Sequence, residues 1–476
     1  MKMQINGKAV DSLSGESFDI FNPATGEFID QVPRGTSEDV VTAVEAASSA
    51  FDSWVSTSSQ QRAGVLYRAA EIARQNRDEL AFLLTKEQGK PIAEAKNEIE
   101  GFASVLEYYC GLAHSLRGDF IQVPQNGYAF TVKKALGVCA AIIPWNMPAL
   151  IMAWKVGPAM ISGNTLVLKP SSNTPLTNLT LASILREAGL PAGVLNVITG
   201  PGEFVGEPLV NHYKVKKVSF TGDQATGKRV AELAVSGIKR VTLELGGSDP
   251  MVVCDDADLE SAVIGALRGR FYNCGQICTA VKRLYVFESV AEEFIRKFEA
   301  AIQKLRIGNG MFENVDMGPL NNQRQLEYVK GLVAEIEEKD EGRIITGGKV
   351  AANSAFSRGY FFEPTLVLDV SRKSRILKEE VFGPVLPVIR VKDLDEAIEE
   401  ANNTSYGLGA SIWTKNLDRA RVGCEQLNAG IIWINQHLKV APEVPFGGIK
   451  KSGIGRENGP YALSEYLDLK TIMIKT

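Results

Sequence analysis

From residue 135 onward, short apolar runs alternate with stretches of helical periodicity, and this pattern limits the chain to a small set of folds. Five runs have the length of buried strands, and helical stretches separate the later ones. The runs are 137–143, 165–168, 193–199, 216–221 and 240–245, and the helical stretches are 174–188, 203–210 and 224–236. This alternation predicts βαβ units, in which a parallel sheet carries helices on its faces.

A second alternating set and two flanking regions complete the pattern. Strands are expected in the second set near 250–254, 283–287, 385–390 and 431–434, and N-terminal helices over 38–54 and 60–85. Residues 128–134 alternate apolar and polar side chains, as an exposed antiparallel strand does. The final run, 470–475, has no local partner, so we expect it to pair with 128–134 or with another subunit.

The composition excludes several classes of protein. The net charge is -4 with interspersed signs, which does not favour a nucleic acid or a membrane surface as partner. The most apolar region, 135–168, is interrupted by three prolines and by Lys155, so we expect no membrane span. The first seven residues are polar and lack the features of a secretory or transit signal, which predicts a cytoplasmic protein.

Cysteine and histidine are too sparse for several kinds of site. The six cysteines contain no CxxC pair, so a disulfide framework is not expected. The three histidines are widely scattered, which disfavours both a metal site and a Ser-His-Asp triad.

Two glycine-rich turns follow predicted strands, and each is compatible with phosphate binding. In the first, Gly200-Pro201-Gly202-Glu203-Phe204-Val205-Gly206, the last interval is one residue longer than in the dinucleotide fingerprint. The second, from Phe220-Thr221-Gly222 to Gly227-Lys228, has the spacing of an NTPase phosphate loop. That loop needs Ser or Thr after the lysine, where this chain has Arg229, so a phosphate-loop NTPase is the weaker alternative. A plain connection between strand and helix remains open for both turns.

Three further motifs carry side chains suited to carbonyl chemistry. Cys278 follows Gly275-Gln276-Ile277, where a glycine lets backbone approach a ligand, and a thiolate attacks carbonyl carbon. Glu244 lies at a strand end between leucines, where an apolar side raises the pKa of a carboxyl and suits a general base. Asn146 lies in a turn with proline on both sides, and its amide can donate to an oxyanion. Each residue alone also fits a purely structural role.

In this order along the chain, the motifs resemble the aldehyde dehydrogenase superfamily. The resemblance also includes Leu168-Lys169-Pro170-Ser171, Glu379-Glu380-Val381-Phe382-Gly383-Pro384-Val385 and the segment 445–453, and so extends over nearly the whole chain. It implies an α/β fold with a variant Rossmann cofactor domain, an α/β catalytic domain and a small antiparallel β oligomerisation element. The implied boundaries are 1–116 and 136–246 for the dinucleotide-binding domain, 247–451 for the catalytic domain, and 117–135 and 452–476 for the oligomerisation element.

The resemblance implies a catalytic role for five residues. Cys278 is the nucleophile, and Asn146 with the backbone N–H of Cys278 forms the oxyanion hole. Glu244 activates the water that releases the product, and Lys155 and Glu457 match positions that relay its proton. A glutamate at 244 favours water over coenzyme A as the acyl acceptor. The implied reaction is oxidation of an aldehyde to a carboxylic acid through a thiohemiacetal and a thioester on the cysteine.

The resemblance also implies how NAD or NADP and the aldehyde are held. Lys169 would contact the adenine ribose and Glu380 the nicotinamide ribose, with Phe382 beside it. The helix that starts near Gln224 would meet the pyrophosphate. The other implied cofactor contacts are Trp145, Ser171, Ser172, Gly202, Phe220, Thr221, Gly222, Asp223, Gly227, Leu245 and Gly246. The implied aldehyde tunnel consists of Met147, Trp154, Tyr272, Ile277, Thr279, Val440 and Phe446.

Two residues depart from the family pattern at the cofactor site. Ser172 stands where NAD-preferring members commonly have a glutamate, and a hydroxyl does not repel a 2′-phosphate, which favours NADP over NAD. Asp223 replaces the more usual serine, and its charge weakens phosphate binding unless it caps the helix and points away.

The tunnel residues are mostly apolar or aromatic, so we expect a neutral aliphatic, aromatic or hydroxy aldehyde rather than a carboxylated semialdehyde. His437 and Lys439 would weaken this expectation if they reached inward. A cysteine hydrolase without cofactor is another alternative, although it lacks an evident histidine partner. An inactive relative is opposed by the intact Cys278, Glu244 and Asn146. We expect a homodimer or homotetramer in which the final strand joins a shared sheet.

Overall fold

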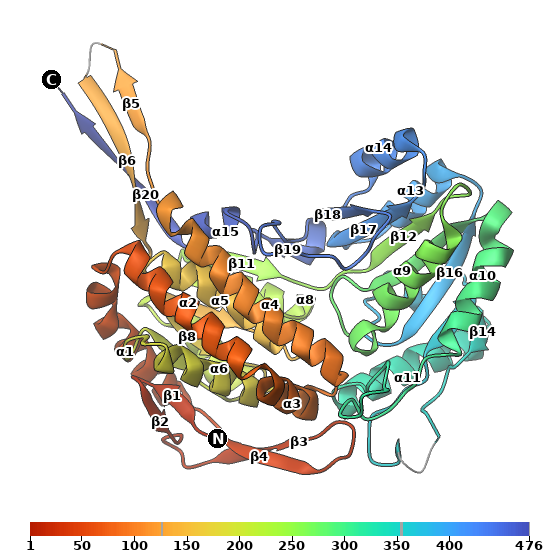
Figure 1. The fold of residues 1–476 in the computed structure, drawn as a ribbon, viewed down its shortest axis with the longest axis horizontal. Coiled ribbons are helices and arrows are strands. Elements are labelled where there is room, and N and C mark those ends of the chain that lie inside the picture. Colours follow the sequence, from red (N-terminus) through yellow and green to blue (C-terminus); the bar gives the residue numbers. More distant parts are fainter. Residues whose placement is uncertain (125–126, 353–355, 476) are drawn as a thin grey trace.

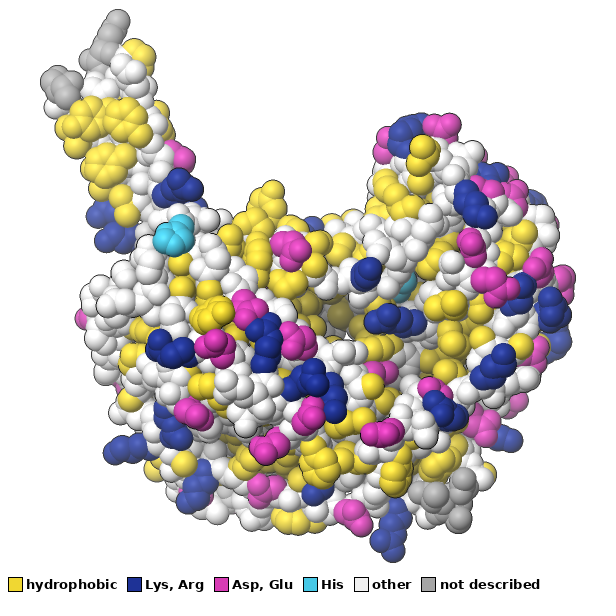
Figure 2. Space-filling view, in the orientation of Figure 1, with side chains coloured by type: hydrophobic (Ala, Val, Ile, Leu, Met, Phe, Trp, Pro, Cys, Tyr) yellow, Lys and Arg dark blue, Asp and Glu magenta, His cyan; other side chains and the backbone are white. Residues whose placement is uncertain are grey.

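Two sheets with parallel cores organise the chain in the computed structural model, which describes residues 1–124, 127–352 and 356–475 (Figure 1). The expected α/β fold is confirmed. The surface is hollowed between the two lobes that these sheets form (Figure 2). Over the described ranges, no helix has the length and apolar character needed to cross a bilayer.

The first sheet has the order β19-β11-β10-β7-β8-β9-β1-β2. Its five parallel strands are β7 (Val138–Ile142), β8 (Thr165–Lys169), β9 (Leu195–Val197), β10 (Val215–Thr221) and β11 (Arg240–Glu244). Three short strands add antiparallel edges: β1 (Met3–Ile5), β2 (Lys8–Val10) and β19 (Gly453–Ile454). Each of the five predicted runs therefore contains a strand of one parallel sheet.

Helices surround this sheet. They are α1 (Ser37–Val55), α2 (Ser59–Gln75), α3 (Arg77–Gln88), α4 (Ile92–Gly111), α5 (Pro148–Ile161), α6 (Pro175–Glu187), α7 (Glu207–Asn211) and α8 (Gln224–Ser236). The helix predicted over 60–85 is wrong in one respect, because it is two helices that meet at Asn76. The Asn76 side chain donates to the carbonyl of Ile72 at 2.8 Å and so competes with the helical backbone pattern. Apolar spacing continued across the break because both helices face the same core.

The second sheet has the order β14-β15-β16-β13-β12-β17-β18. Its strands are β12 (Asp249–Val253), β13 (Val281–Phe287), β14 (Arg343–Thr346), β15 (Thr365–Leu368), β16 (Val385–Val391), β17 (Gly409–Trp413) and β18 (Ile431–Ile434). Only β14 is antiparallel to its neighbour within this described sheet. Four of these strands were predicted; β14, β15 and β17 were missed, because they are short or begin with small residues.

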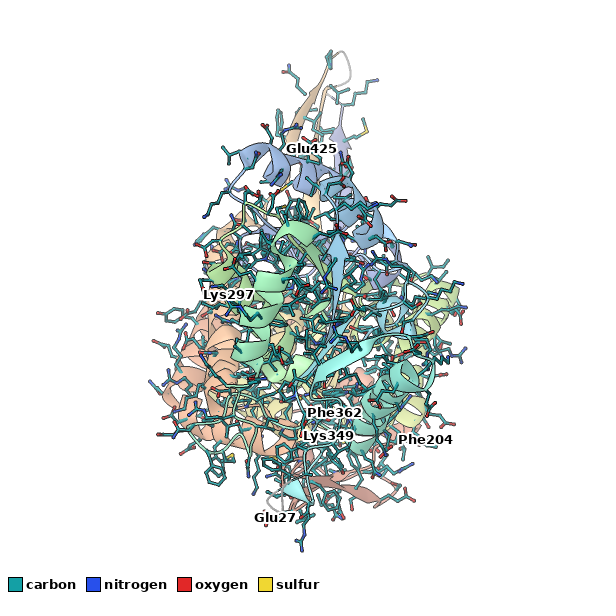
Figure 3. All side chains as sticks on the ribbon, turned by 90° about the vertical axis from the view of Figure 1, so that its right-hand side faces the viewer. Glu27, Phe204, Lys297, Lys349, Phe362 and Glu425 are labelled. Atoms are coloured by element: carbon teal, nitrogen blue, oxygen red, sulfur yellow. The ribbon has the colours of Figure 1, made fainter. Side chains whose placement is uncertain are left out.

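The second sheet has its own helices. They are α9 (Leu259–Phe271), α10 (Glu288–Ile302), α11 (Gln323–Glu338), α12 (Arg375–Lys378), α13 (Leu394–Asn402) and α14 (Leu417–Gln426). Figure 3 labels Lys297 on α10 and Glu425 on α14, which contact this sheet from outside. A separate hairpin of β3 (Ser17–Phe21) and β4 (Phe28–Pro33) lies along the base of the molecule (Figure 1).

A three-stranded antiparallel arm projects from the body (Figure 1). It consists of β5 (Phe120–Val123), β6 (Gly127–Ala135) and β20 (Leu467–Ile474), in the order β20-β6-β5. The register runs from Leu467 opposite Ala135 to Ile474 opposite Tyr128, so the final strand pairs with residues 128–135 of its own chain. The segment after residue 452 thus contributes to two sheets, through β19 and through β20.

The fold brings the predicted site residues to one edge. Asn146 follows β7, Gly222 follows β10, and Gly246 follows β11, at the carboxyl ends of parallel strands. Ligands of open α/β sheets bind at this edge. The nucleophile loop approaches it from the second sheet, and Cys278 packs against the core that the first sheet shares with Phe446.

Candidate active site

The nucleophile loop joins α9 to β13 through a short 3-10 turn, η3 (Tyr272–Gly275). Asn273 and Cys274 have φ values of 49° and 56°, and Gly275 follows at 73°, so three successive residues are left-handed. A side chain at Gly275 would place its Cβ 2.4 Å from the carbonyl oxygen of Gly383. Glycine is therefore required for the loop to lie against the 379–385 segment.

Cys278 is partly buried, and the charged groups around it shift the pKa of its thiol in opposite directions. Burial raises the pKa of its thiol to about 12, and the Lys282 ammonium acts against this rise. The carboxyl groups of Glu380, Asp249 and Glu244 act in the same direction as burial. Nucleophilic attack at neutral pH therefore needs a group that favours the thiolate.

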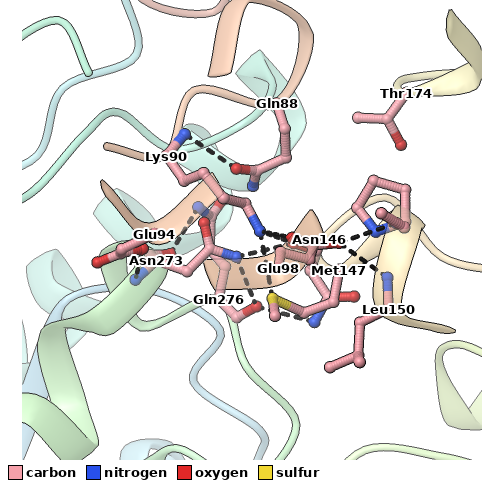
Figure 4. Close-up of polar contacts among 12 residues, drawn as sticks. Gln88, Lys90, Glu94, Glu98, Asn146, Met147, Leu150, Thr174, Asn273 and Gln276 are labelled. Atoms are coloured by element: carbon pink, nitrogen blue, oxygen red, sulfur yellow. Dashed lines mark hydrogen bonds and ion pairs between the residues drawn. The ribbon is translucent and has the colours of Figure 1, made fainter. Parts of the chain in front are cut away.

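Asn146 is held by residues of the nucleophile loop and by Lys90, which follows helix α3 (Figure 4). Its side-chain nitrogen donates to the Gln276 carbonyl at 2.9 Å, two residues before Cys278. Its own carbonyl accepts from Lys90 Nζ at 2.8 Å and from Asn273 Nδ2 at 3.0 Å. An amide nitrogen carries two donors, and one of them is engaged with Gln276.

A buried network that sequence reasoning missed supports this turn. Lys90 forms an ion pair with Glu98, and both side chains are 0% exposed. Glu98 also accepts from the backbone N–H groups of Ala149 and Leu150, at 2.8 and 3.2 Å, in the first turn of α5. Glu94 accepts from the Asn273 N–H at 2.9 Å. The signal was available: both glutamates lie at core positions of the α4 periodicity.

Glu244 ends β11 in an apolar setting. Neither carboxylate oxygen accepts a hydrogen bond from any residue that the structure describes. Burial raises the pKa of Glu244 well above its usual value, and the nearby Glu457 carboxylate raises it further. A side chain at Gly447 would place its Cβ 2.7 Å from Glu244 Oε1, so glycine there leaves room for the carboxyl.

Lys155 and Glu457 lie together, as predicted. Lys155 Nζ is 2.6 Å from Glu457 Oε1 and donates to Thr221 Oγ1 at 2.7 Å. Ser219 donates to the same Glu457 oxygen at 2.8 Å. This polar chain is buried and electrostatically coupled to Glu244. Thr221, predicted as a cofactor contact, here holds the Lys155 ammonium.

Helix α8 begins at Gln224, the helix start to which the resemblance assigns the pyrophosphate. Asp223 caps it, accepting from the Thr226 N–H at 2.9 Å and from Thr226 Oγ1 at 2.7 Å. A side chain at Gly227 would place its Cβ 2.3 Å from Leu245 Cδ2, so glycine allows α8 to pack closely on β11. The Asp223 charge is thus used in capping.

Lys169 and Ser172 lie at the far end of this edge. Lys169 Nζ donates to the Pro170 carbonyl at 2.9 Å, and burial lowers its pKa to about 8. Ser172 Oγ donates to the Gly200 carbonyl at 3.2 Å. The Gly200 turn is thus tied to Ser172. Gly202 begins η2, a π-helical turn (Gly202–Gly206), where a regular helix was expected.

Glu380 and Phe382 approach from the second sheet. Glu380 Oε1 accepts from the Gly247 N–H at 3.1 Å and lies 3.1 Å from Lys282 Nζ. A side chain at Gly246 would place its Cβ 2.0 Å from Glu380 Oε2. The Phe382 ring meets Trp145 edge-on, with 5.4 Å between centroids.

The predicted tunnel residues divide into two groups. Met147, Trp154, Val440 and Phe446 pack in one apolar cluster with Cys278, and the Trp154 and Phe446 rings lie 4.8 Å apart. The other three, on the nucleophile loop, are Tyr272, Ile277 and Thr279.

His437 and Lys439 do not change the apolar character of the cluster. The His437 ring nitrogens contact Ser411 Oγ at 2.9 Å and the Thr279 carbonyl at 2.8 Å. Lys439 is exposed. A cysteine hydrolase that uses His437 as base is disfavoured, because both ring nitrogens are already engaged.

The phosphate-loop alternative is also disfavoured. The Lys228 side chain is 81% exposed and lies 3.9 Å from Glu232 on the same helix. Arg229 pairs with Glu207 at 2.8 Å. A phosphate-loop lysine has to point into the loop, whereas this one lies in solvent.

Comparisons with known proteins agree with this geometry. Residues 10–472 match the model of the aldehyde dehydrogenase family. The chain is 42% identical to retinaldehyde dehydrogenase 3 of Mus musculus and 40% identical to aldehyde dehydrogenase 1A1 of Homo sapiens, over all of this chain and 93% and 95% of theirs.

Solved structures are equally similar. An NADP-dependent enzyme of E. coli superposes with a TM-score of 0.97 at 40% identity, covering 100% of this chain and 98% of that one. Betaine aldehyde dehydrogenase from Staphylococcus aureus in complex with NAD+ superposes with a TM-score of 0.97 at 35% identity, covering 100% and 95%. The chain belongs to the aldehyde dehydrogenase family and is an NAD(P)-dependent enzyme that oxidises aldehydes to acids.

Proposed function

We propose that this enzyme oxidises a neutral aldehyde to its carboxylic acid through a thioester on Cys278, with NADP as the preferred cofactor. The observation that carries the proposal is the convergence of three groups on one loop. Asn146 is hydrogen-bonded to the Gln276 carbonyl two residues before the thiol, and the buried Glu244 and the partly buried Glu380 both act on the thiol electrostatically.

In the first half-reaction, the Cys278 thiolate attacks the aldehyde carbon, and the carbonyl π bond becomes an alkoxide. The Asn146 amide and the Cys278 backbone N–H stabilise this oxyanion. The alkoxide then re-forms the carbonyl as the carbon–hydrogen bond breaks, which leaves a thioester on the enzyme. NAD(P), when bound, supplies the nicotinamide ring that accepts the hydride.

In the second half-reaction, Glu244 takes a proton from water as the water oxygen attacks the thioester. The carbon–sulfur bond then breaks, which releases the acid and returns the thiolate. Glu244 suits this role because burial raises the pKa of its carboxyl, which strengthens it as a base. The proton passes toward the Lys155–Glu457 pair, which is coupled to Glu244 and joined at 2.6 Å.

The residues at the sheet edge fit a dinucleotide. Helix α8 offers its N-terminus for the pyrophosphate, although Asp223 already satisfies one of its N–H groups. In this proposal Lys169 contacts the adenine ribose and Glu380 the nicotinamide ribose, and the contact between Phe382 and Trp145 supports a ring-binding surface beside Glu380.

NADP preference rests on Ser172. Its hydroxyl is anchored on the Gly200 carbonyl, and no carboxylate occupies this position to repel a 2′-phosphate. The similar E. coli protein is described as NADP dependent, whereas the Staphylococcus enzyme was solved with NAD+. We expect Ser172→Glu to lower the ratio of kcat/KM for NADP to that for NAD by about 100-fold, because like charges placed together cost several kcal/mol. An unchanged ratio would remove Ser172 from the proposal.

A second copy of this chain is the proposed partner, at the arm. Phe120, Leu469 and Met473 are 71%, 62% and 68% exposed there, which is unfavourable for an isolated strand ribbon. We expect a dimer or tetramer by light scattering and a smaller species for the double variant Leu469→Asp, Met473→Asp.

The proposed location is cytoplasmic. All six cysteines, each of which the structure describes, are free thiols, in keeping with this location.

The deciding experiment is an aldehyde panel with both cofactors. The panel contains an aliphatic, an aromatic, a hydroxy and a carboxylated aldehyde, and formation of the reduced cofactor is followed by absorbance. We expect turnover of one neutral class, preference for NADP, and no turnover by Cys278→Ala. Cys424→Ala is the matched control, because that thiol is exposed on α14. Exclusive use of the carboxylated aldehyde would replace the proposed substrate class, and activity in Cys278→Ala would overturn the mechanism.

A further inference from the structure

Lys282 is a buried cation to which the mechanism above gives no role. It lies on β13, four residues after the nucleophile, and its side chain is 0% exposed. Isolated buried ammonium groups are costly, so a lysine in such a position needs partners that use its charge.

Two hydrogen bonds and one ion pair connect this ammonium to the active site. Nζ donates to the carbonyl of Ile277 at 2.9 Å and to the carbonyl of Cys278 itself. The third partner is the Glu380 carboxylate at 3.1 Å. Lys282 therefore joins the nucleophile loop, through two hydrogen bonds, to the carboxylate assigned to the nicotinamide ribose, through an ion pair.

We propose that Lys282 is a positioning residue that joins the nucleophile to the cofactor site: it fixes the backbone of residues 277–278, holds Glu380, and supplies the positive charge that favours the Cys278 thiolate. The inference rests on the proposed roles of Cys278 and Glu380. It adds the group that couples them.

The charges around Cys278 come from four elements and are mostly negative. Lys282 on β13 is opposed by Asp249 on β12, by Glu244 on β11 and by Glu380 before β16. Asp249 is buried, and side chains at Gly247 and Gly409 would place their Cβ atoms 2.7 and 2.3 Å from its carboxylate oxygens. Removal of the one cation in this group should therefore disfavour the thiolate, and removal of Asp249's charge should favour it.

A purely structural lysine provides the contrast. Lys239 Nζ also donates to two backbone carbonyls, those of Val210 and His212, at a distance from the nucleophile loop. Lys239→Met therefore removes a comparable clamp without removing a charge from the active site. If Lys282 acted only as a clamp, its loss would resemble that of Lys239.

The test measures the rate of Cys278 alkylation by iodoacetamide against pH, with the modified residue identified by mass spectrometry. We expect Lys282→Met to raise the midpoint of the thiolate titration by about 1 pH unit, because the variant loses the positive charge that acts on the thiol, and a nearby opposite charge shifts a pKa by about 1–3 units. Asp249→Asn should move it down, and Lys239→Met should leave it in place. We also expect Lys282→Met to raise KM for NADP more than KM for the aldehyde, since Glu380 loses its ion pair and keeps only the Gly247 N–H.

Each outcome has one meaning. An unshifted titration in Lys282→Met would overturn the inference and leave the proposed function standing. Failure to modify Cys278 in the unmutated enzyme would instead count against the proposed function. If the methionine variant does not fold, Lys282→Gln takes its place, because it keeps two donors for the carbonyls while removing the charge.

Discussion

Two glutamates of the same lobe, Glu98 and Glu244, are both buried but differ in their hydrogen-bond partners, and this difference indicates different roles. Glu98 pairs with Lys90 and also accepts two N–H bonds from the first turn of α5. Glu244 is as deeply buried, yet neither of its oxygens meets a donor in the described part of the chain. A buried carboxylate without partners costs free energy, so its retention indicates a use other than stability.

The difference separates structural from reactive carboxyl groups. Glu98 is fixed by its ion pair with Lys90, which in turn holds the Asn146 turn. The Glu244 carboxyl is left free to bind and release a proton, because burial raises its pKa and no hydrogen bond from the described residues holds either oxygen. Three substitutions test this contrast.

The largest effect is expected from Glu244→Gln on catalysis. We expect kcat to fall by about 1,000-fold, the range for loss of a positioned general base. Acylation should persist, so one equivalent of reduced cofactor forms rapidly and the thioester is seen as a mass increase on the enzyme. The free energy of unfolding should change little, because neither carboxyl oxygen of Glu244 accepts a hydrogen bond from the described residues and glutamine has nearly the same shape.

The pH dependence of deacylation provides a second test of Glu244→Gln. Only ionised Glu244 is a base, so deacylation in the wild type should rise with pH, up to the raised pKa of this carboxyl. Gln does not titrate, and the rise should be absent from the variant. Rapid steady turnover by Glu244→Gln, with an unchanged profile, would contradict the assignment.

Glu98→Gln should show the opposite behaviour. We expect the free energy of unfolding to fall by about 3 kcal/mol, since removal of one partner leaves the buried Lys90 charge uncompensated. Chemical denaturation monitored by fluorescence measures the loss. The control is Glu45→Gln, whose carboxylate is 45% exposed beside Lys214 and should contribute below about 1 kcal/mol. Equal losses in both variants would mean that burial does not distinguish the two pairs.

The same distinction explains what could be predicted from the sequence. Strands with continuous apolar runs, such as β7 and β8, were found because burial on both faces leaves a direct mark. The roles of Cys278 and Glu244 came from motif order, and the structure brings their surroundings together without assigning those roles. Gly246 and Gly275 could be read from the sequence, but the reason for glycine at these positions could not. The atoms that a side chain there would clash with, Glu380 Oε2 and the Gly383 carbonyl oxygen, belong to residues more than 100 positions away.

Charged residues in apolar segments were the signal that sequence reasoning left unused. Lys282 and Arg283 interrupt the β13 run, and Glu94 and Glu98 occupy the buried face of α4. Their partners lie on other elements, and long-range pairing leaves no periodicity in a single sequence. The break at Asn76 was missed for a related reason: the competing hydrogen bond depends on a side-chain rotamer rather than on spacing.

The smallest effect is expected at Asp249, which extends the comparison to a third buried carboxyl. It resembles Glu244, because neither oxygen accepts a hydrogen bond of normal geometry from the described residues.

Burial raises the pKa of Asp249 from 3.8 to about 7, so the folded protein holds this proton more tightly than the unfolded chain does. The stability linked to that proton is present at acidic pH and is lost as the pH rises toward and through 7. Asparagine does not ionise, so the stability of Asp249→Asn, followed through its melting temperature, should gain on that of the wild type between pH 5 and pH 8 by about 2.5 kcal/mol, since one pKa unit is equivalent to about 1.4 kcal/mol. Calorimetry at four pH values measures this gain. Parallel curves for the two proteins would show that folding does not raise the pKa of Asp249, and the contrast with Glu98 would then not extend to this carboxyl.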